Sequence, residues 1–508
     1  MHVVFKQYSQ HQAMLLPPSL DELVRADNPV RVVNAVLDRV DMDPLLKKFK
    51  GGGTSRYHPK MLLMVLVYAY INNIFSSRKI EEALQSNINF MWLSGMSQPD
   101  HNTINRFRSD RLKDSLRYIF TQVVVLLAEQ GVLSLKEAYV DGTKIEANAN
   151  RYTFVWGNAI KTNKEKMVQQ LDDLWKYAQK VAAAEMTDKD PGGFDKIDPE
   201  KVEQTIATIN EALKDKEISK EVKQKLNYAK KNWPTKLQEY KVREGIIGEG
   251  RSSYSKTDTD ATFMRTKEDH MKNGQLRPGY NLQISTNNQY ILSYSIHQKP
   301  NDINTLIEHV NQYRGEYKQY PAVITADAGY GSEENYQFLE DNNITSYVKY
   351  NQFHKEQLAK RKQESTFSYD QLFYNAEQDF YTCPMGQRMD RIRDKARQTV
   401  TGYKQTVARY QAKNCAGCPM RGVCHSAAAN RTLEVNHNMV RLKDVSRQNL
   451  LSEQGLLHRK QRCADVEPVF GNIKYNHHFK RFMLRGKDKV AVEAGLLALE
   501  EKKQPEMT

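Results

Sequence analysis

Residues 322–327 read AVITAD, a short apolar run that ends in a carboxylate. Gly329 and Gly331 follow and turn the chain into a helix that we expect to begin near Glu333. Residues 138–143 read AYVDGT, a second β-prone run in which an aspartate is followed by glycine. Short apolar strands that alternate with helices are typical of a mixed sheet with helices packed on it. The fold class that we predict is therefore α/β.

The segments between and after these two runs extend the same sheet. Residues 280–296 alternate polar and apolar side chains on either side of a polar turn, which predicts a β-hairpin. A helix at about 304–313 and a strand at 344–350 continue the pattern. We expect both Asp141 and Asp327 to lie where a strand of this sheet ends.

A chain of 508 residues is too long for one ordinary core. Its composition and the spacing of its apolar residues change at several points. Apolar residues at 167–181 and 202–213 follow the spacing of a coiled-coil seam, which predicts a helical hairpin inserted into the sheet domain. We expect an all-helical N-terminal domain at 1–134, an α/β core at 135–156 and 251–350, the hairpin at 157–250, a Cys-containing insertion at 351–440, and a C-terminal helical part of the core at 441–508.

The composition excludes several classes of protein. Hydrophobic residues make up 40% of the chain and charged residues 27%, and 27 Tyr and 17 Phe exclude disorder throughout. Five cysteines are too few for a disulfide scaffold. The longest apolar run, residues 61–71, is shorter than the roughly 20 residues that cross a bilayer, and no signal-peptide pattern opens the chain. We expect a cytoplasmic protein with no membrane partner.

The net charge of +14 is concentrated in one stretch. Residues 391–490 hold 21 Lys and Arg against 7 Asp and Glu, so the rest of the chain sums to zero. Such a surplus favours nucleic acid as a partner, although a solvated basic surface has the same composition. Arg106, Arg108 and Arg111 lie on a basic N-terminal helix that would either enter a DNA groove or form a solvated outer face.

Carboxylates supply the candidate chemistry. Two or three carboxylates that converge at strand ends, as we expect for Asp141 and Asp327, can hold a pair of Mg²⁺ ions. Glu467 is the third candidate, because Pro468 suits a helix first turn and would leave Glu467 at the helix entrance. Lys474 lies two helical turns further on and would share its face. The alternative for an aspartate before a glycine is ordinary turn chemistry.

Three motifs carry a resemblance to a known family. Residues 139–149 read YVDGTKIEANA, residues 326–330 read ADAGY and residues 466–474 read VEPVFGNIK. Together they resemble bacterial insertion-sequence transposases of the DDE type, and more narrowly the insertion-sequence family numbered eleven eighty-two. Residues 100–108, DHNTINRFR, are similar to the helical N-terminal domain of that family. The resemblance covers nearly the whole chain.

The resemblance implies an RNase-H-like core in which Asp141, Asp327 and Glu467 bind two Mg²⁺ ions, with Mn²⁺ as a substitute. It implies an endonuclease and strand transferase that cuts double-stranded DNA at the ends of its element, joins the 3′-hydroxyl ends to target DNA, and works as a homodimer on DNA. Lys474 fits the lysine of the family and would contact DNA near the scissile phosphate. Arg462 stands one position too early for the arginine of the family, and the usual tyrosine is missing. The side chains that we expect to contact DNA are Arg106, Arg108, Arg111, Arg462, Lys480, Arg481 and Arg485.

Cys383, Cys415, Cys418 and Cys424 offer four thiolates to one tetrahedral metal ion. Structural Zn²⁺ prefers such ligands in a reducing compartment, and His425 could replace one of them. The alternative is four reduced thiols that bind nothing. Cys463 stands apart from the cluster.

Two other functions compete with a transposase. A catalytically inactive, transposase-derived DNA-binding protein would keep the fold without turnover. The missing tyrosine and the unusual tail at residues 500–505 motivate this alternative, whereas the three carboxylates argue against it. A general RNase-H-like nuclease would cut DNA without recognising element ends.

Overall fold

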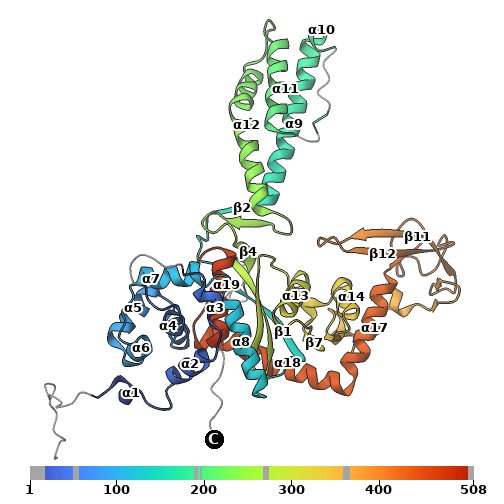
Figure 1. Cartoon of the computed structure of the whole chain (residues 1–508). Coiled ribbons are helices and arrows are strands. Elements are labelled where there is room, and N and C mark those ends of the chain that lie inside the picture. Colours follow the sequence, from blue (N-terminus) through green and yellow to red (C-terminus); the bar gives the residue numbers. More distant parts are fainter. Residues whose placement is uncertain are drawn as a thin grey trace, which may run out of the picture.

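The computed structural model describes residues 18–49, 56–187, 193–194, 197–266, 274–357 and 367–500. The described residues between Leu20 and Glu129 form a helical region (Figure 1). Its elements are α1 (Leu20–Leu23), α2 (Pro29–Asp38), α3 (Asp43–Leu46), α4 (Pro59–Ile71), α5 (Ser77–Ser86), α6 (Ile88–Ser94), α7 (His101–Arg106), the π-helical turn η1 (Phe107–Arg111) and α8 (Leu116–Glu129).

Helices α2, α3 and α4 each have proline in the first turn. Pro29 opens α2, and the side chain of Asn28 caps the helix by accepting a hydrogen bond from the Val30 amide at 3.0 Å. Pro59 opens α4 in the same way. Nearly every side chain of α4 is buried, which is typical of a helix at the centre of a core.

The central sheet is mixed, as predicted. Its main path is β4 (Thr262–Arg265), β5 (Leu276–Asn287), β1 (Glu137–Glu146), β7 (Val323–Ala326) and β8 (Thr345–Val348), and β6 (Tyr290–His297) also pairs with β5. β1, β7 and β8 are parallel, and β5 is antiparallel to β1 and to β6. The connections between the strands contain η2 (Asp302–Asn304), α13 (Leu306–Tyr317), η3 (Ala328–Tyr330) and α14 (Glu333–Asp341).

Two local expectations about the sheet need correction. β1 does not end at Asp141 but continues to Glu146, because Gly142 and the residues after it pair with β5. The sequence predicts a four-residue turn at 286–289, but Thr286 and Asn287 pair with β6, so the β5–β6 turn consists of Asn288 and Gln289, both at positive φ.

A helical bundle projects from the sheet between two short paired strands, β2 (Phe154–Trp156) and β3 (Ser253–Ser255) (Figure 1). It contains three long helices, not the two of the expected hairpin: α9 (Gly157–Val181), α11 (Pro199–Ala212) and α12 (Lys220–Ile247), with the short α10 (Ala183–Met186) after α9. The bundle has its own hydrophobic core, which includes Leu171, Ile206 and Trp233.

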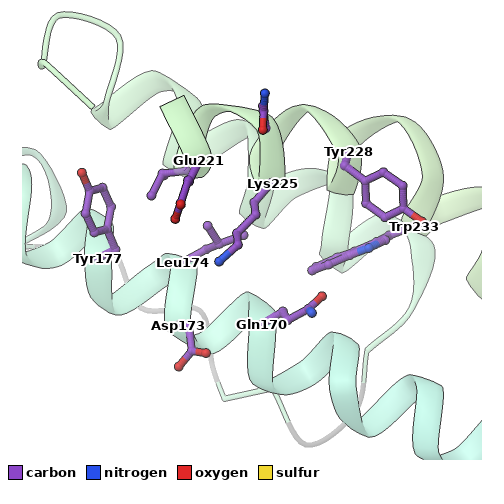
Figure 2. A pocket seen from close by; sticks show the side chains of 10 residues that line it. Gln170, Asp173, Leu174, Tyr177, Glu221, Lys225, Tyr228 and Trp233 are labelled. Atoms are coloured by element: carbon purple, nitrogen blue, oxygen red, sulfur yellow. The ribbon is translucent and has the colours of Figure 1, made fainter. Parts of the chain in front are cut away.

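A surface groove runs between α9 and α12 of this bundle (Figure 2). Tyr177, Tyr228 and Trp233 supply its aromatic side chains, and Asp173 and Lys225 supply charges of both signs. None of the candidate site residues lines it.

The region with the cysteines forms a second sheet, which the sequence patterns did not predict. It is antiparallel in the order β13 (Thr432–Val435), β12 (Lys404–Ala412), β11 (Arg388–Gln398), β10 (Phe380–Thr382) and β9 (Tyr374–Asn375). The short elements α15 (Phe353–Glu356) and η4 (Tyr369–Gln371) precede it.

The chain returns to helices after this sheet, as expected, with α17 (His437–Leu451), α18 (Glu453–Gly471), the π-helical turn η5 (Asn472–Asn476) and α19 (Lys487–Glu500). α19 packs against α4, α8 and β6, so one hydrophobic core runs through the N-terminal helices, the central sheet and the C-terminal helices. Within the described part of the chain, no helix combines the length and the hydropathy needed to cross a bilayer. The tail beyond residue 500 lies outside the described residues.

Candidate active site

Asp141 and Asp327 come from neighbouring parallel strands. Val140 of β1 pairs with Ala326 of β7, and each aspartate is the next residue in the chain. Asp327 directly follows β7 and caps η3, where its Oδ1 accepts a hydrogen bond from the Gly329 amide at 2.8 Å. The two carboxylates therefore lie at the same level of the sheet, although only Asp327 follows the end of its strand.

α18 crosses β1, β5, β7 and β8 and brings Glu467 to these aspartates. Arg462 of the same helix joins the two segments, because its Nη2 lies 3.0 Å from Asp141 Oδ2 and its Nη1 lies 3.5 Å from Glu467 Oε1. The Arg462 side chain is only 7% exposed, whereas that of Glu467 is 56% exposed. Arg462 is thus held between two candidate carboxylates, which is a correction to its expected role as a DNA contact.

The position of Glu467 within its helix also differs from the expectation. Pro468 lies inside α18, close to its end, and not in the first turn. Proline has no amide hydrogen, so the carbonyl of Ala464 loses its helical partner. The Gln289 side chain in the β5–β6 turn donates to this carbonyl at 3.1 Å and ties α18 to the sheet.

A buried polar network lies beneath the carboxylates. The Tyr330 hydroxyl donates to Gln283 Oε1, and both side chains are fully buried. Burial, reinforced by the charges of Asp141, Asp302 and Asp327, raises the pKa of Tyr330 well above its usual value. The phenol therefore stays neutral and acts as a hydrogen-bond donor.

The sequence patterns did not identify Asp302 as part of this site. It begins η2 and accepts hydrogen bonds on Oδ1 from Asn281 and Gln283, two buried side chains of β5. Its signal in the sequence was a polar residue between an alternating strand and a helix, the same context that indicated Asp327.

Oxygen ligands of this kind suit Mg²⁺ or Mn²⁺, so the donor set of the site fits the expected ions. Across the described ranges, however, no three His, Cys, Asp or Glu side chains are grouped closely enough to hold a metal ion as they stand. At the carboxylates, Arg462 pairs with Asp141 Oδ2 and the Gly329 amide donates to Asp327 Oδ1.

The expected DNA-binding side chains differ widely in exposure. Arg108 is 2% exposed and donates to the Phe75 carbonyl and the Tyr70 hydroxyl, so it belongs to the core and cannot reach DNA. Lys474 is also buried, and its ammonium donates to the Lys144 carbonyl of β1 at 3.3 Å. Both findings correct the predicted DNA contacts.

The other basic candidates lie closer to the surface. Arg106, Lys480, Arg481 and Arg485 are exposed, whereas Arg111 is half-buried with its guanidinium over the Phe49 ring. Arg481 donates to the Ala147 carbonyl and Arg485 to that of Asn148, directly after β1. This end of the sheet therefore carries a basic surface.

The four clustered cysteines line one cavity, together with His425 and Arg431. The backbone amides of Gln387 and Arg431 donate to the sulfur atoms of Cys383 and Cys415. The Arg431 guanidinium donates to the Cys424 sulfur at 2.7 Å. Cys463 is exposed on α18 and stands apart, as expected.

Comparison with known families identifies the class of protein. Residues 382–500 match the family described as "Transposase DDE domain", and residues 18–110 match "Transposase domain (DUF772)". Both matches indicate a transposase. More particularly, the two matches together indicate an insertion-sequence transposase of the DDE type, which confirms the resemblance. The DDE match includes Glu467 but neither Asp141 nor Asp327. No curated protein matches the chain.

Proposed function

We propose that this transposase cuts DNA at the ends of its own element and joins the freed 3′-hydroxyl ends to target DNA, with Asp141, Asp327 and Glu467 as the catalytic carboxylates. The observation that carries the proposal is the pairing of Arg462 with both Asp141 and Glu467, beside Asp327 on the adjacent strand. An RNase-H-like core is supported by the mixed sheet, in which β5 and β6 form an antiparallel edge next to parallel β1, β7 and β8. The narrower assignment to one insertion-sequence family stays a prediction.

In the cleavage step a water oxygen attacks phosphorus and the 3′ oxygen leaves. In the transfer step the freed 3′-hydroxyl attacks a phosphorus of the target DNA, and the 3′ oxygen of the target strand leaves. Asp141, Asp327 and Glu467 would hold two divalent ions, which would supply positive charge to the reacting phosphate. Asp141 and Asp327 are placed by the paired strands, and Glu467 is placed by α18. Arg462 compensates the carboxylate charges and keeps α18 close to β1.

Exposed basic side chains supply a path for the DNA backbone. Lys480, Arg481 and Arg485 lie beside the end of β1, and their charges would bind phosphates near the carboxylates. Arg106 and Arg111 of the N-terminal helices remain DNA contacts in the proposal. A homodimer would bring two element ends together.

We further propose a structural zinc ion at Cys383, Cys415, Cys418 and Cys424. The proposal is supported by the shared cavity and by the amide hydrogen bonds that two of the sulfur atoms accept. Arg431 donates a hydrogen bond to the Cys424 sulfur and so places a positive charge beside the proposed ligands. Its guanidinium would then lie outside the ligand shell as a charge partner.

The test is excision from a donor plasmid that carries the native flanks of the gene, in the presence of Mg²⁺ and a target plasmid. Wild type should release the element and insert it into the target, and Glu467→Gln should do neither. Glu453→Gln, an exposed residue at the start of the same helix, is the matched control and should retain activity.

The alternatives predict other results in the same assay. Binding of the flanks without cleavage by wild type would favour an inactive DNA-binding protein. Cleavage of unrelated duplexes at the same rate would favour a general nuclease. Equal excision by wild type and Glu467→Gln would remove Glu467 from the site.

A further inference from the structure

Asp302 lies next to the candidate catalytic aspartates although it is distant from them in the sequence. It begins η2, the short turn that follows β6, and η2 packs against η3, which Asp327 caps. The charges of Asp141, Asp302 and Asp327 all act on the Tyr330 hydroxyl. One carboxylate from strand β1 and two from connections of the sheet therefore lie close enough to act on one buried phenol.

The two oxygens of Asp302 have different environments. Oδ1 accepts hydrogen bonds from Asn281 Nδ2 at 2.7 Å and from Gln283 Nε2 at 2.9 Å. Both donors are fully buried in β5, so they fix the carboxylate in one orientation. Oδ2 accepts no hydrogen bond from any residue that the structure describes. One oxygen is thus anchored and the other is available for a ligand.

Two glycines allow this carboxylate to approach the catalytic pair. A Cβ atom at Gly142, the residue after Asp141, would stand 2.9 Å from Asp302 Oδ1 and 2.1 Å from Gln283 Nε2. A Cβ atom at Gly329 would lie 2.9 Å from Asp327 Oδ1 and 3.8 Å from Asp302 Oδ2. Any larger residue at position 142 would displace the amide that holds Asp302, and Oδ2 faces the same small space as Asp327.

We propose that Asp302 contributes its free oxygen, Oδ2, to the divalent-cation site of Asp141 and Asp327, as a fourth carboxylate beside Glu467. The inference rests on the proposed function and extends it to a residue that lies outside the three motifs. A hard cation takes six or more oxygen ligands, so a site with two ions has room for a further carboxylate. The anchoring amides hold Asp302 in place before the ion arrives, which lowers the cost of binding.

Asp302→Asn separates this role from a purely structural one. Asparagine keeps an oxygen that can accept both amide hydrogen bonds, and it replaces Oδ2 by an amide group without charge. The fold should therefore be retained, and unfolding by urea in the presence of a chelator checks this directly. Asp341→Asn, at the exposed end of α14, is the matched control for the same chemical change.

The measurement is Mn²⁺ binding to the full-length protein without DNA, followed by the electron paramagnetic resonance signal of the free ion. We expect Asp302→Asn and Asp141→Asn each to weaken Mn²⁺ binding at least about tenfold, and Asp341→Asn to leave it unchanged. Wild-type affinity in a folded Asp302→Asn, together with weak binding by Asp141→Asn, would overturn the role of Asp302 alone. Absence of Mn²⁺ binding by wild type would overturn both this inference and the proposed metal chemistry.

Discussion

Arg462 holds together two carboxylates that come from distant parts of the chain. Its guanidinium lies 3.0 Å from Asp141 and 3.5 Å from Glu467, and little of it reaches solvent. When one partner of a buried ion pair is removed, the remaining charge is left without compensation and the folded state loses stability. Because Glu467 is half exposed, water screens part of this loss.

We predict that Arg462→Gln lowers the free energy of unfolding by about 1–3 kcal/mol in the presence of a chelator. Mn²⁺ should restore more stability to this variant than to wild type, because the ion would replace the missing positive charge. Urea unfolding with and without Mn²⁺ measures both effects. Arg462→Lys keeps the charge and should lose less. Equal stability of Arg462→Gln and wild type would show that the ion pairs contribute nothing.

At the scale of single residues, the sequence predicted the carboxylates that follow recognisable patterns. Asp327 follows an apolar strand, and Asp141 and Glu467 belong to motifs with a known resemblance. Asp302 and Tyr330 were missed, because their importance comes from contacts with β5 that no local pattern reports. Arg108 was misjudged because a basic residue on a helix is normally exposed, whereas its donors here find partners in the core.

Among the elements, α18 shows how a sheet turn can compensate for a helix proline. Pro468 leaves the Ala464 carbonyl without its helical donor, and Gln289 of the β5–β6 turn donates to it. The same contact fixes the helix that carries Glu467 against the sheet. The sequence pattern predicted that this helix begins at Pro468, whereas α18 begins at Glu453. Proline fits a first turn, but it also fits a helix interior where a side chain from another element donates to the unpaired carbonyl.

A double-mutant cycle tests this contact. Gln289→Leu should cost about 1 kcal/mol in wild type, because the carbonyl is then left without a donor. In Pro468→Ala the helix supplies its own amide hydrogen, so the same substitution should cost markedly less. Thermal unfolding of wild type, the two single variants and the double variant gives the coupling energy between Gln289 and Pro468. Equal costs in both backgrounds would mean that the hydrogen bond does not stabilise the helix.

The sheet with the cysteines was not predicted because its long strands are rich in Lys and Arg. Most side chains of β11 are exposed, so its sequence lacks the alternation of apolar and polar residues that predicts a strand. The small core of this sheet consists of only a few residues, among them Met389, Tyr410 and Cys415. A sheet with so small a core is the kind that a bound metal stabilises.

We predict about one zinc ion per chain in the purified full-length protein, measured by mass spectrometry of the metal content. Cys418→Ser should lose most of this zinc, since it removes one of four ligands. Cys463→Ser changes an exposed thiol outside the cluster and should retain it. Zinc-free wild type purified without a chelator would contradict the proposal.

At the scale of the whole molecule, the described residues form three hydrophobic cores, which define its organisation better than sequence segments do. The N-terminal helices share one core with the central sheet, whereas the helical bundle and the cysteine-containing sheet each have their own. Periodicity could predict the helices of the first 134 residues but not that they pack on α19 and β6. That contact joins residues from opposite ends of the chain.

This organisation predicts which part of the chain can be removed. Trp156 and Ser253 pair across β2 and β3, so an Asn-Gly turn can replace residues 157–252 and close the two strands as a hairpin. That chain should unfold cooperatively, as measured by calorimetry. A chain without residues 18–134 should not, because its apolar core would be exposed to water. Loss of cooperative unfolding without residues 157–252, or cooperative unfolding without residues 18–134, would contradict the shared core.

The central claim is that Asp141, Asp327 and Glu467 act together on one phosphodiester bond. The most direct measurement is the single-turnover cleavage rate of a labelled duplex that carries one element end. Asp141→Asn, Asp327→Asn and Glu467→Gln are compared with wild type at saturating protein. We expect each variant to bind the duplex and to cleave it at least about a thousandfold more slowly. A variant that binds the duplex and cleaves it at close to the wild-type rate would contradict the claim.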